Sequence, residues 1–325
     1  MKAMLCRRFG EPEELQWAEA PAPALPADGV RIAVRAAALN FPDLLMLRGL
    51  YQYRPAFPFA PGMECAGEVL EVGPEVTDFR PGDRVAAHPW DNCFAEQVVA
   101  PAATVFPVPW AMDDASAAAF VIAYGTVYHA LIDRAELLAG ETLLVLGAAG
   151  GIGLPAIELG KLLGANVIAA ARGPEKLALA KAYGADHLID YAAEDLRQRV
   201  KELTGGKGAD VCFDPVGGEM SLAALSCLGW GGRLLILGFA SGAIAALPAN
   251  RLLIKGQEVI GCGYHRFNTM APQQARQNMA RLLAWWQAGR LKPHLGLRFA
   301  MQEAPRALRA MAERRLAGKA VLTLG

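Results

Sequence analysis

The sequence lacks an excess of charge of either sign. Its 325 residues include 32 Lys and Arg and 32 Asp and Glu, so the formal net charge is zero. Proteins that bind nucleic acid or anionic membrane surfaces usually carry a basic excess. We therefore expect neither partner, and any anionic ligand must be held by local groups.

Cysteine is scarce, and its spacing excludes two common uses. No two of the six cysteines form a C-x-x-C pair, which argues against a zinc knuckle, and a chain of this length rarely depends on a disulfide framework. We expect six buried, reduced thiols: Cys6, Cys65, Cys93, Cys212, Cys227 and Cys262.

Long apolar runs are also few. Residues 115–132 and 234–250 are long stretches without Asp, Glu, Lys or Arg, and both contain polar or turn-forming residues such as Tyr124 and Pro248. A membrane helix needs about 20 mainly apolar residues, so we expect two buried segments of a soluble fold. Arg7 and Arg8 interrupt the N-terminus before any apolar run, which predicts no signal peptide and a cytoplasmic protein.

The chain is long enough for two domains, and its first part is rich in predicted strands. Alternating or apolar segments at 30–34, 68–72 and 84–87 are separated by turn signals such as Gly73-Pro74 and Pro81-Gly82-Asp83. Short strands joined by tight turns predict a compact, partly open barrel.

The pattern changes near residue 113, where Asp113 or Asp114 is suited to cap an Ala-rich helix. Apolar strands then alternate with helices, which predicts a parallel sheet covered on both faces. The strands are expected at 142–146, 166–170, 187–190, 209–213 and 233–237, and the helices at 152–163, 174–183 and 193–203.

The last part is again irregular, with a helix near 273–286 and a final apolar segment at 320–324. We expect this tail to return to the first domain. The predicted limits are 1–117 for the first part of a β-rich catalytic domain, 118–261 for a cofactor domain and 262–325 for the return.

The strongest local motif is the glycine-rich segment 146–153, which follows a predicted strand and opens a helix. Small residues let the backbone approach a pyrophosphate, and the helix N-terminus offers free N–H groups. Ala148 stands where the usual fingerprint has its first glycine, and a tight turn without a ligand is the alternative. The predicted cofactor contacts are Gly147, Ala149, Gly150, Gly151, Ile152 and Gly153.

A second cofactor signal is an absence. NAD-specific folds usually carry Asp or Glu about 20 residues after the glycine motif. Here the first charged residue after the second strand is Arg172, followed by Lys176. An arginine can bind a phosphate with two N–H groups, so the sequence favours NADPH, although Arg172 as a plain surface charge is the alternative.

These features belong to a wider resemblance. The chain resembles the quinone oxidoreductases of the medium-chain dehydrogenase/reductase superfamily, the branch that includes zeta-crystallin. The resemblance implies an α/β protein with a GroES-like β-rich catalytic domain, a Rossmann domain with a doubly wound parallel sheet, and an active site in the cleft between them. The motifs that carry it lie at 38–43, 48–51, 61–67, 82–85, 146–153, 183–186 and 318–322.

The resemblance also implies roles for single residues. It places Arg172, Lys176 and Tyr191 near the 2′-phosphate or the adenine ribose, and Thr126 near the nicotinamide carboxamide. Asn40 is expected to face the nicotinamide or the substrate. Two further positions, Gly238 and Lys319, are expected on the cofactor side.

No zinc is expected. In zinc-dependent relatives a cysteine and a histidine stand at the positions of Asn40 and Met63, neither of which is a plausible zinc ligand. Cys93 and His88 alone make a weak metal site. Without a Lewis acid, alcohol oxidation is disfavoured, whereas a quinone or a conjugated enone or thioester needs less activation.

Tyr51 is the candidate proton donor, because it matches the tyrosine that follows the Arg/Gln-Gly motif in related enoyl-thioester reductases. Its alternative role is an aromatic wall of an apolar pocket. Candidate substrate contacts are Asp43, Tyr53 and Arg266, with Asp43 alternatively a helix cap and Arg48 its ion-pair partner. His265 is the only histidine near the expected cleft, and it is given no role.

These observations leave three functional hypotheses. The first is a zinc-independent NADPH:quinone reductase, and the second an NADPH-dependent reductase of an activated C=C bond in an enone or enoyl thioester. The third is a non-catalytic NADPH-binding protein of the crystallin or sensor kind. In every case the partner is a small molecule, and a homodimer through residues 257–261 is expected.

Overall fold

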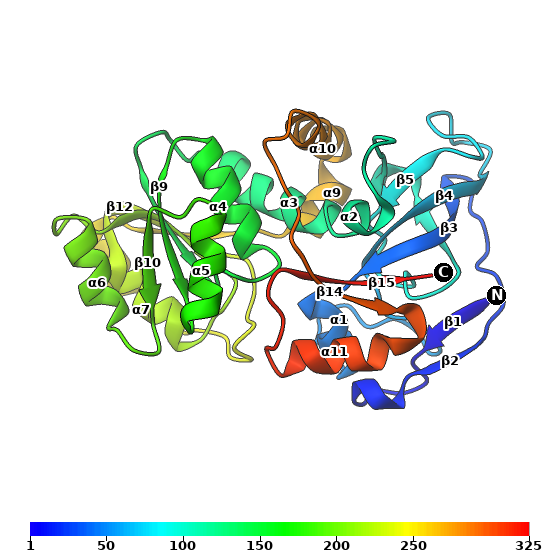
Figure 1. Ribbon diagram of the computed structural model, residues 1–325, viewed down its shortest axis with the longest axis horizontal. Coiled ribbons are helices and arrows are strands. Elements are labelled where there is room, and N and C mark those ends of the chain that lie inside the picture. The colour runs from blue at the N-terminus through cyan, green and yellow to red at the C-terminus, as the bar shows by residue number, and fades with distance from the viewer. Residues whose placement is uncertain (325) are drawn as a thin grey trace. The chain divides into compact units, whose positions relative to one another are not determined.

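The computed structural model describes residues 1–324, which form two compact units (Figure 1). Unit 1 consists of Met1–Ile122 and of the segment that begins at His265, and unit 2 is Ala123–Tyr264. The limits of these compact units are not domain boundaries. The predicted boundaries after residues 117 and 261 therefore stay predictions.

Unit 1 is built on a seven-stranded sheet with the order β14-β15-β3-β4-β5-β7, in which β6 also pairs with β3. A separate two-stranded ribbon pairs β1 with β2. The strands are β1 (Lys2–Leu5), β2 (Gln16–Glu19), β3 (Gly29–Ala38), β4 (Glu64–Val72), β5 (Arg84–Ala87), β6 (Gln97–Pro101), β7 (Val105–Pro107), β14 (Leu295–Ala300) and β15 (Lys319–Thr323).

The core of unit 1 follows from the alternation of its strands. Ile32 and Val34 of β3 point to the same side as apolar residues of neighbouring strands, including Val69 of β4 and Val85 of β5. The C-terminal strand β15 pairs antiparallel with β3, with Val321 opposite Ala38. The helices with residues in unit 1 are α1 (Phe41–Leu47), α2 (Asp114–Ala118), part of α3 (Val121–Tyr128), most of α9 (Tyr264–Met270), α10 (Pro272–Gln287) and α11 (Ala304–Ala312).

Unit 2 contains a six-stranded sheet, parallel throughout, with the order β10-β9-β8-β11-β12-β13. Its strands are β8 (Thr142–Leu146), β9 (Asn166–Ala171), β10 (His187–Asp190), β11 (Ala209–Asp214), β12 (Leu228–Ile236) and β13 (Glu258–Gly261). Its helices are the larger part of α3, a π-helical turn at His129–Arg134, α4 (Gly153–Leu162), α5 (Pro174–Ala182), α6 (Leu196–Leu203), α7 (Glu219–Cys227) and α8 (Ala249–Lys255). The predicted doubly wound α/β class is confirmed.

The order of strands in unit 2 determines where a ligand can bind. From β8 the chain moves outward through β9 to β10, and it then returns to β11 on the other side of β8. The adjacent carboxyl ends of β8 and β11 therefore form the topological switch point, which is the usual ligand site of an open parallel sheet. The glycine-rich segment begins directly after β8.

Three details of the sequence prediction were wrong. Residues 234–250 are not a buried segment: beyond Leu235 the chain is partly exposed, and Ile244 is 78% exposed because it lies in a loop after β12. Strand β12 begins at Leu228, five residues before the predicted 233. The glycines among its first residues weaken the apolar pattern by which a strand is predicted. Helix α6 begins at Leu196 rather than 193, where Asp195 accepts a hydrogen bond from the Gln198 N–H.

The capping prediction at the start of α2 was right, because the Asp113 side chain accepts from the Ser116 N–H. Residues 115–132, the other charge-free stretch, are mostly buried as expected. Within residues 1–324, no helix combines the length and the apolar character needed to cross a membrane.

Candidate functional site

The glycine turn of unit 2 leads from β8 into α4 and leaves several backbone amides free. Gly147 has φ 59°, and a Cβ on Gly153 would lie 2.3 Å from the Gly147 carbonyl oxygen, so neither position tolerates a side chain easily. Among residues 1–324, no acceptor pairs with the amides of Ala149, Gly151 and Ile152. Free N–H groups at the start of a helix are suited to bind a phosphate.

Asp214 supports this turn, although the sequence patterns did not indicate such a role. It ends β11 with no exposed surface, and its carboxylate accepts from the Val216 N–H at 2.8 Å and the Gly217 N–H at 3.0 Å, and from the Ser221 hydroxyl. The loop it shapes packs Val216 near Gly147. The only available signal was an acid at the end of an otherwise apolar strand.

Arg172 and Tyr191 come together because their strands are neighbours. Ala171, the last residue of β9, pairs with Asp190, the last residue of β10, so the residues that follow emerge side by side. The Arg172 guanidinium carbon lies 5.9 Å from the centroid of the Tyr191 ring. This is a cation–π distance, and Arg172 remains exposed to solvent.

The other predicted cofactor positions of unit 2 lie at the ends of strands or on helices. Lys176 is in the first turn of α5, and Gly238 lies two residues beyond the end of β12. Thr126 is a nearly buried residue of α3. Direct contacts of these residues with a cofactor stay predictions.

In unit 1, three predicted or neighbouring residues form a buried charged network that we call the Glu64 network: Asn40, Glu64 and Lys319. The Lys319 ammonium donates to Glu64 Oε1 at 2.7 Å and to Asn40 Oδ1 at 2.8 Å, and its third bond goes to the Leu39 carbonyl at 2.8 Å. Glu64 Oε2 accepts from the Ile122 N–H at 2.8 Å. Glu64 has no exposed surface, so this ion pair is shielded from water.

The network fixes the orientation of the Asn40 side chain. An ammonium only donates and a carboxylate only accepts, so Oδ1 must face Lys319 and Nδ2 must face Glu64, to which it donates at 2.9 Å. The second Nδ2 hydrogen meets only the Ala38 carbonyl, at 3.4 Å. Asn40 therefore keeps one weakly engaged donor. Lys319, in contrast, has all three hydrogens engaged within unit 1.

Asp43 caps helix α1, which was one of its two expected roles. Its carboxylate accepts from the Asn40 N–H at 2.7 Å and from the Gly62 N–H at 3.2 Å. Burial raises the pKa of Asp43 to about 7, against the effect of these N–H groups and of Lys319. Its side chain has no exposed surface, and a contact with substrate stays a prediction.

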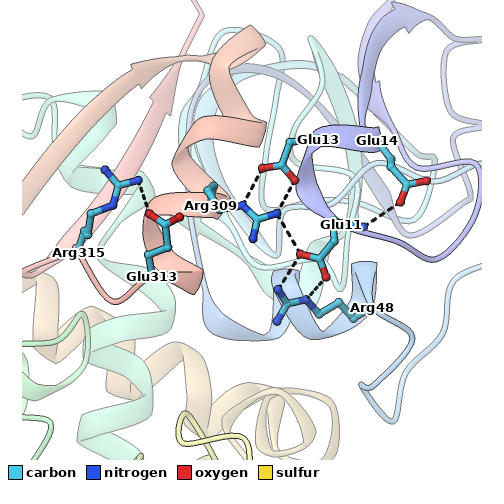
Figure 2. Close-up of polar contacts among 7 residues, drawn as sticks. All are labelled: Glu11, Glu13, Glu14, Arg48, Arg309, Glu313 and Arg315. Atoms are coloured by element: carbon cyan, nitrogen blue, oxygen red, sulfur yellow. Dashed lines mark hydrogen bonds and ion pairs between the residues drawn. The ribbon is translucent and has the colours of Figure 1, made fainter.

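The expected pairing of Arg48 with Asp43 was wrong. Figure 2 shows Arg48 paired instead with Glu11, at 2.8 Å, and Arg309 paired with both Glu11 and Glu13. Arg48 caps the far end of α1, away from the buried cap at Asp43. The sequence offered no signal for a partner 37 residues upstream.

An aromatic group in unit 1 surrounds Trp90, a residue that no sequence pattern indicated. The Tyr53 ring stacks on Trp90 at 4.9 Å, and the Tyr51 ring meets it edge-on at 6.4 Å. The Tyr53 hydroxyl donates to Asp91 at 3.2 Å, and burial together with Asp91 raises the pKa of Tyr53 to about 12. Burial also raises the pKa of Tyr51, so both phenols stay protonated at neutral pH.

Tyr51 differs from Tyr53 in its hydroxyl. In the described chain no group pairs with the Tyr51 hydroxyl, whereas the Tyr53 hydroxyl is held by Asp91. Tyr51 is therefore the phenol with a free O–H group. Arg266 is an exposed residue of α9, and its predicted contact with substrate stays untested.

The donor groups around Asn40 do not fit zinc. A catalytic zinc site needs about three protein ligands, usually thiolate, imidazole or carboxylate. Here the Lys319 ammonium already occupies the cation position beside Glu64 and Asn40, and Met63 is an apolar core residue. Across residues 1–324, no cluster of three His, Cys, Asp or Glu side chains is arranged to hold a metal ion.

Comparisons with known proteins agree with this architecture. Residues 26–110 match the alcohol dehydrogenase GroES-like domain, and residues 151–285 match the zinc-binding dehydrogenase family. The GroES-like assignment of the β-rich part is thereby confirmed. The second family's name refers to zinc, which the residues of this chain do not accommodate.

Full-length relatives specify the family more closely. The chain is 36% identical to the quinone oxidoreductase-like protein 2 homolog of Nematostella vectensis, over 99% of this chain and 88% of that protein. It is 35% identical to a quinone oxidoreductase of Pseudomonas aeruginosa, over 97% of each. The structure of Escherichia coli quinone oxidoreductase complexed with NADPH matches with a TM-score of 0.93 at 29% identity, over the whole of both chains. The chain therefore belongs to the quinone oxidoreductase-like enzymes of the medium-chain dehydrogenase/reductase superfamily.

Proposed function

We propose that this protein is a zinc-independent reductase that uses NADPH to reduce a quinone or a similar electron-poor acceptor. The observation that carries the proposal is the Arg172–Tyr191 pair at the ends of β9 and β10, in a chain whose relatives include a quinone oxidoreductase complexed with NADPH. Where an NAD-specific enzyme has an acid for the ribose hydroxyls, this chain presents an exposed guanidinium.

The roles of the residues in unit 2 follow from their chemistry. The free amides of Ala149, Gly151 and Ile152 would hold the pyrophosphate, helped by the dipole of α4. Arg172 and Lys176 would hold the 2′-phosphate, with Tyr191 keeping the guanidinium in place. NADPH, when bound, supplies the hydride.

In unit 1 the residues would bind and orient the acceptor. The remaining Nδ2 hydrogen of Asn40 would donate to an acceptor oxygen that gains negative charge, and the Glu64 network holds the amide in the orientation this requires. No residue supplies a Lewis acid, which fits an acceptor that is already electrophilic.

A second candidate function is reduction of an activated C=C bond, and the Tyr51 hydroxyl favours it. A free phenol that stays protonated at neutral pH can deliver a proton to a developing enolate. This proposal makes Tyr51 a catalytic residue, whereas quinone reduction requires it only as part of the aromatic group around Trp90.

The test follows NADPH or NADH absorbance with 1,4-benzoquinone, phenanthrenequinone, crotonyl-CoA and acryloyl-CoA. We expect turnover of the quinones with NADPH, and a loss of about tenfold or more in kcat/KM for NADPH in Arg172→Ala, but not for NADH. Lys181→Ala, on the same helix as Lys176, serves as the control. Faster turnover with NADH would refute the cofactor assignment.

The same assay separates the two candidate functions. Preference for the CoA esters, abolished by Tyr51→Phe, would establish the C=C reductase. Preference for quinones with Tyr51→Phe retaining activity would establish the quinone reductase.

The oligomeric state also stays a proposal. Strand β13 is the edge of the parallel sheet, and Val259 is 37% exposed on it. Exposed sheet edges with apolar residues favour pairing with another chain, so we propose a homodimer through β13. Val259→Lys should yield a monomer in sedimentation experiments, and an unchanged mass would refute this interface.

A further inference from the structure

Helix α9 carries two polar side chains that the proposed reaction does not use, and both contain buried atoms without partners. Asn268 has no exposed surface, and neither its Oδ1 nor its Nδ2 has a hydrogen-bond partner in the described residues. The Nε2 atom of His265 is likewise buried and unpaired there. Buried polar groups are normally hydrogen-bonded, and an unpaired one destabilises the folded protein.

The two residues share one side of the helix. They are three positions apart, a spacing that places side chains next to each other on a helix surface. His265 also contacts the ring of Trp90 and so lies beside the aromatic group that includes Tyr51 and Tyr53. The unpaired Nε2 atom of His265 thus lies in unit 1 beside the aromatic group around Trp90.

A chain of hydrogen bonds determines which His265 nitrogen carries the proton. His88 Nδ1 lies 2.8 Å from the Met63 carbonyl oxygen, which can only accept, so Nδ1 of His88 is the donor. In the neutral ring, Nε2 of His88 is then an acceptor. His265 Nδ1 lies 3.2 Å from that nitrogen and must donate to it. His265 Nε2 is left with a lone pair and no hydrogen.

Both rings are neutral at ordinary pH, which keeps this arrangement in place. Burial lowers the pKa of His88, and burial together with His88 lowers the pKa of His265 to about 3. His265 Nε2 is therefore an obligatory hydrogen-bond acceptor. A simple quinone offers only acceptor oxygens, which this lone pair repels.

We propose that His265 Nε2 is a specificity-determining group that selects acceptors carrying their own O–H or N–H donor, and that Asn268 Nδ2 binds a carbonyl oxygen of the same ligand. The expected substrate class is a quinone substituted with a neutral hydroxyl or amide group. This inference rests on the proposed function, since it assumes that the acceptor lies beside Trp90.

The test compares two ligands of nearly equal size, 2-(hydroxymethyl)-1,4-naphthoquinone and 2-ethyl-1,4-naphthoquinone, which differ in one O–H group. Isothermal titration of the full chain measures both dissociation constants. One neutral hydrogen bond predicts a preference of about twofold to tenfold for the hydroxymethyl compound. Equal affinities would overturn the proposal.

Three variants test the individual roles. His265→Phe keeps a ring against Trp90 and should reduce the ratio of affinities to about one. In His88→Phe the Nδ1 atom of His265 loses its acceptor, so Nε2 can carry the hydrogen and donate to a quinone carbonyl. The ethyl compound should then bind more tightly than it binds the wild type, and the ratio should fall. Asn268→Leu should lower the affinity for both ligands equally, because both carry the quinone carbonyl group. His187→Phe, at an exposed position of β10, is the matched control and should change nothing.

The outcomes distinguish this inference from the proposed function. If neither naphthoquinone supports NADPH oxidation, the quinone reductase proposal fails, and the binding ratio still reports on His265. If both turn over but the ratio is one, or survives in His265→Phe, only the present inference fails. An unchanged ratio in His88→Phe would also count against the tautomer argument.

Discussion

Two charged networks connect distant parts of unit 1, and they differ in their exposure to water. The Glu64 network joins β15 to β4 and to the start of α1, and its ion pair is 7% and 0% exposed at Lys319 and Glu64. The second, which we call the Glu11 network, joins α11 to the N-terminal segment through Glu11, Glu13, Arg48 and Arg309 (Figure 2). Its four side chains are 31–55% exposed.

The comparison shows that similar ion pairs serve different purposes. In water, a broken ion pair is solvated again, so an exposed pair contributes little to stability. In a dry interior, removing one partner leaves a charge that nothing solvates. The Glu64 network is therefore suited to hold the Asn40 amide in one orientation, whereas the Glu11 network only adds surface contacts.

The largest effect is expected from Lys319→Met, which leaves Glu64 buried without a counter-ion. We expect a loss of about 3–5 kcal/mol in the free energy of unfolding, measured by urea denaturation. Added salt should not change this loss, since ions do not screen a buried pair effectively. A loss below about 1 kcal/mol would show that water reaches the network.

A second variant separates the buried charge from the packing. In Glu64→Leu/Lys319→Met both charges are absent, and only the neutral groups at Leu39, Asn40 and Ile122 lose partners. We expect the double variant to be more stable than Lys319→Met alone by about 1–2 kcal/mol. Quinone reduction should still be impaired, because Asn40 is no longer held, and recovery of full kcat would contradict its positioning role.

The two units also differ in how much of their structure the sequence could predict. The parallel sheet of unit 2 and its glycine turn were predictable because continuous apolar strands, glycine stops and a strand-to-helix turn are local patterns. The placement of Arg172 and Tyr191 near each other was expected only from the family resemblance, and the structure explains it because both residues directly follow neighbouring strands. Asp214 was missed, because its hydrogen bonds to the following loop appear only in three dimensions.

Unit 1 was harder, since its site is assembled from segments far apart in the chain. Lys319 and Asn40 were identified only through the family resemblance, and nothing local indicated that Glu64 would lie between them, 255 residues from Lys319. Trp90 and the His88–His265 pair were missed for the same reason: their contact spans 177 residues. Sequence patterns describe elements, whereas this site depends on how the elements pack.

A smaller effect concerns pH, to which Asp43, beside the Glu64 network, and Glu13, within the Glu11 network, respond with opposite sign. Asp43 has a folded pKa of about 7, above its ordinary 3.8, so the folded state holds a proton that the unfolded state has released. Its contribution to stability therefore falls as pH rises from about 4 to about 7. The pKa of Glu13 is lowered to about 2, mainly by Arg309, so its contribution is lost only as pH falls from about 4.5 to 2.

Urea midpoints at intervals from pH 4 to pH 8 test the Asp43 effect in the wild type and in Asp43→Asn. The slope over this range, rather than the stability itself, is the readout, because the amide also loses one backbone hydrogen bond. Both proteins share His88 and His265, whose lowered pKa values act in the opposite direction below pH 6.5. The variant should lose the part of the slope due to Asp43, and identical slopes would mean that Asp43 is ionised throughout.

The smallest effect is expected from Arg309→Met, the counterpart of Lys319→Met in the Glu11 network. Arg309 donates to Glu11 and Glu13, but water solvates both carboxylates when it is removed, and Arg48 still pairs with Glu11. Methionine keeps most of the apolar stem that packs on the surface. The urea midpoint should fall slightly at low salt and hardly at all in 1 M NaCl, where the wild-type pair is already screened. A loss as large as that of Lys319→Met, or one that salt leaves unchanged, would mean that this network is as dry as the Glu64 network and that exposure does not distinguish them.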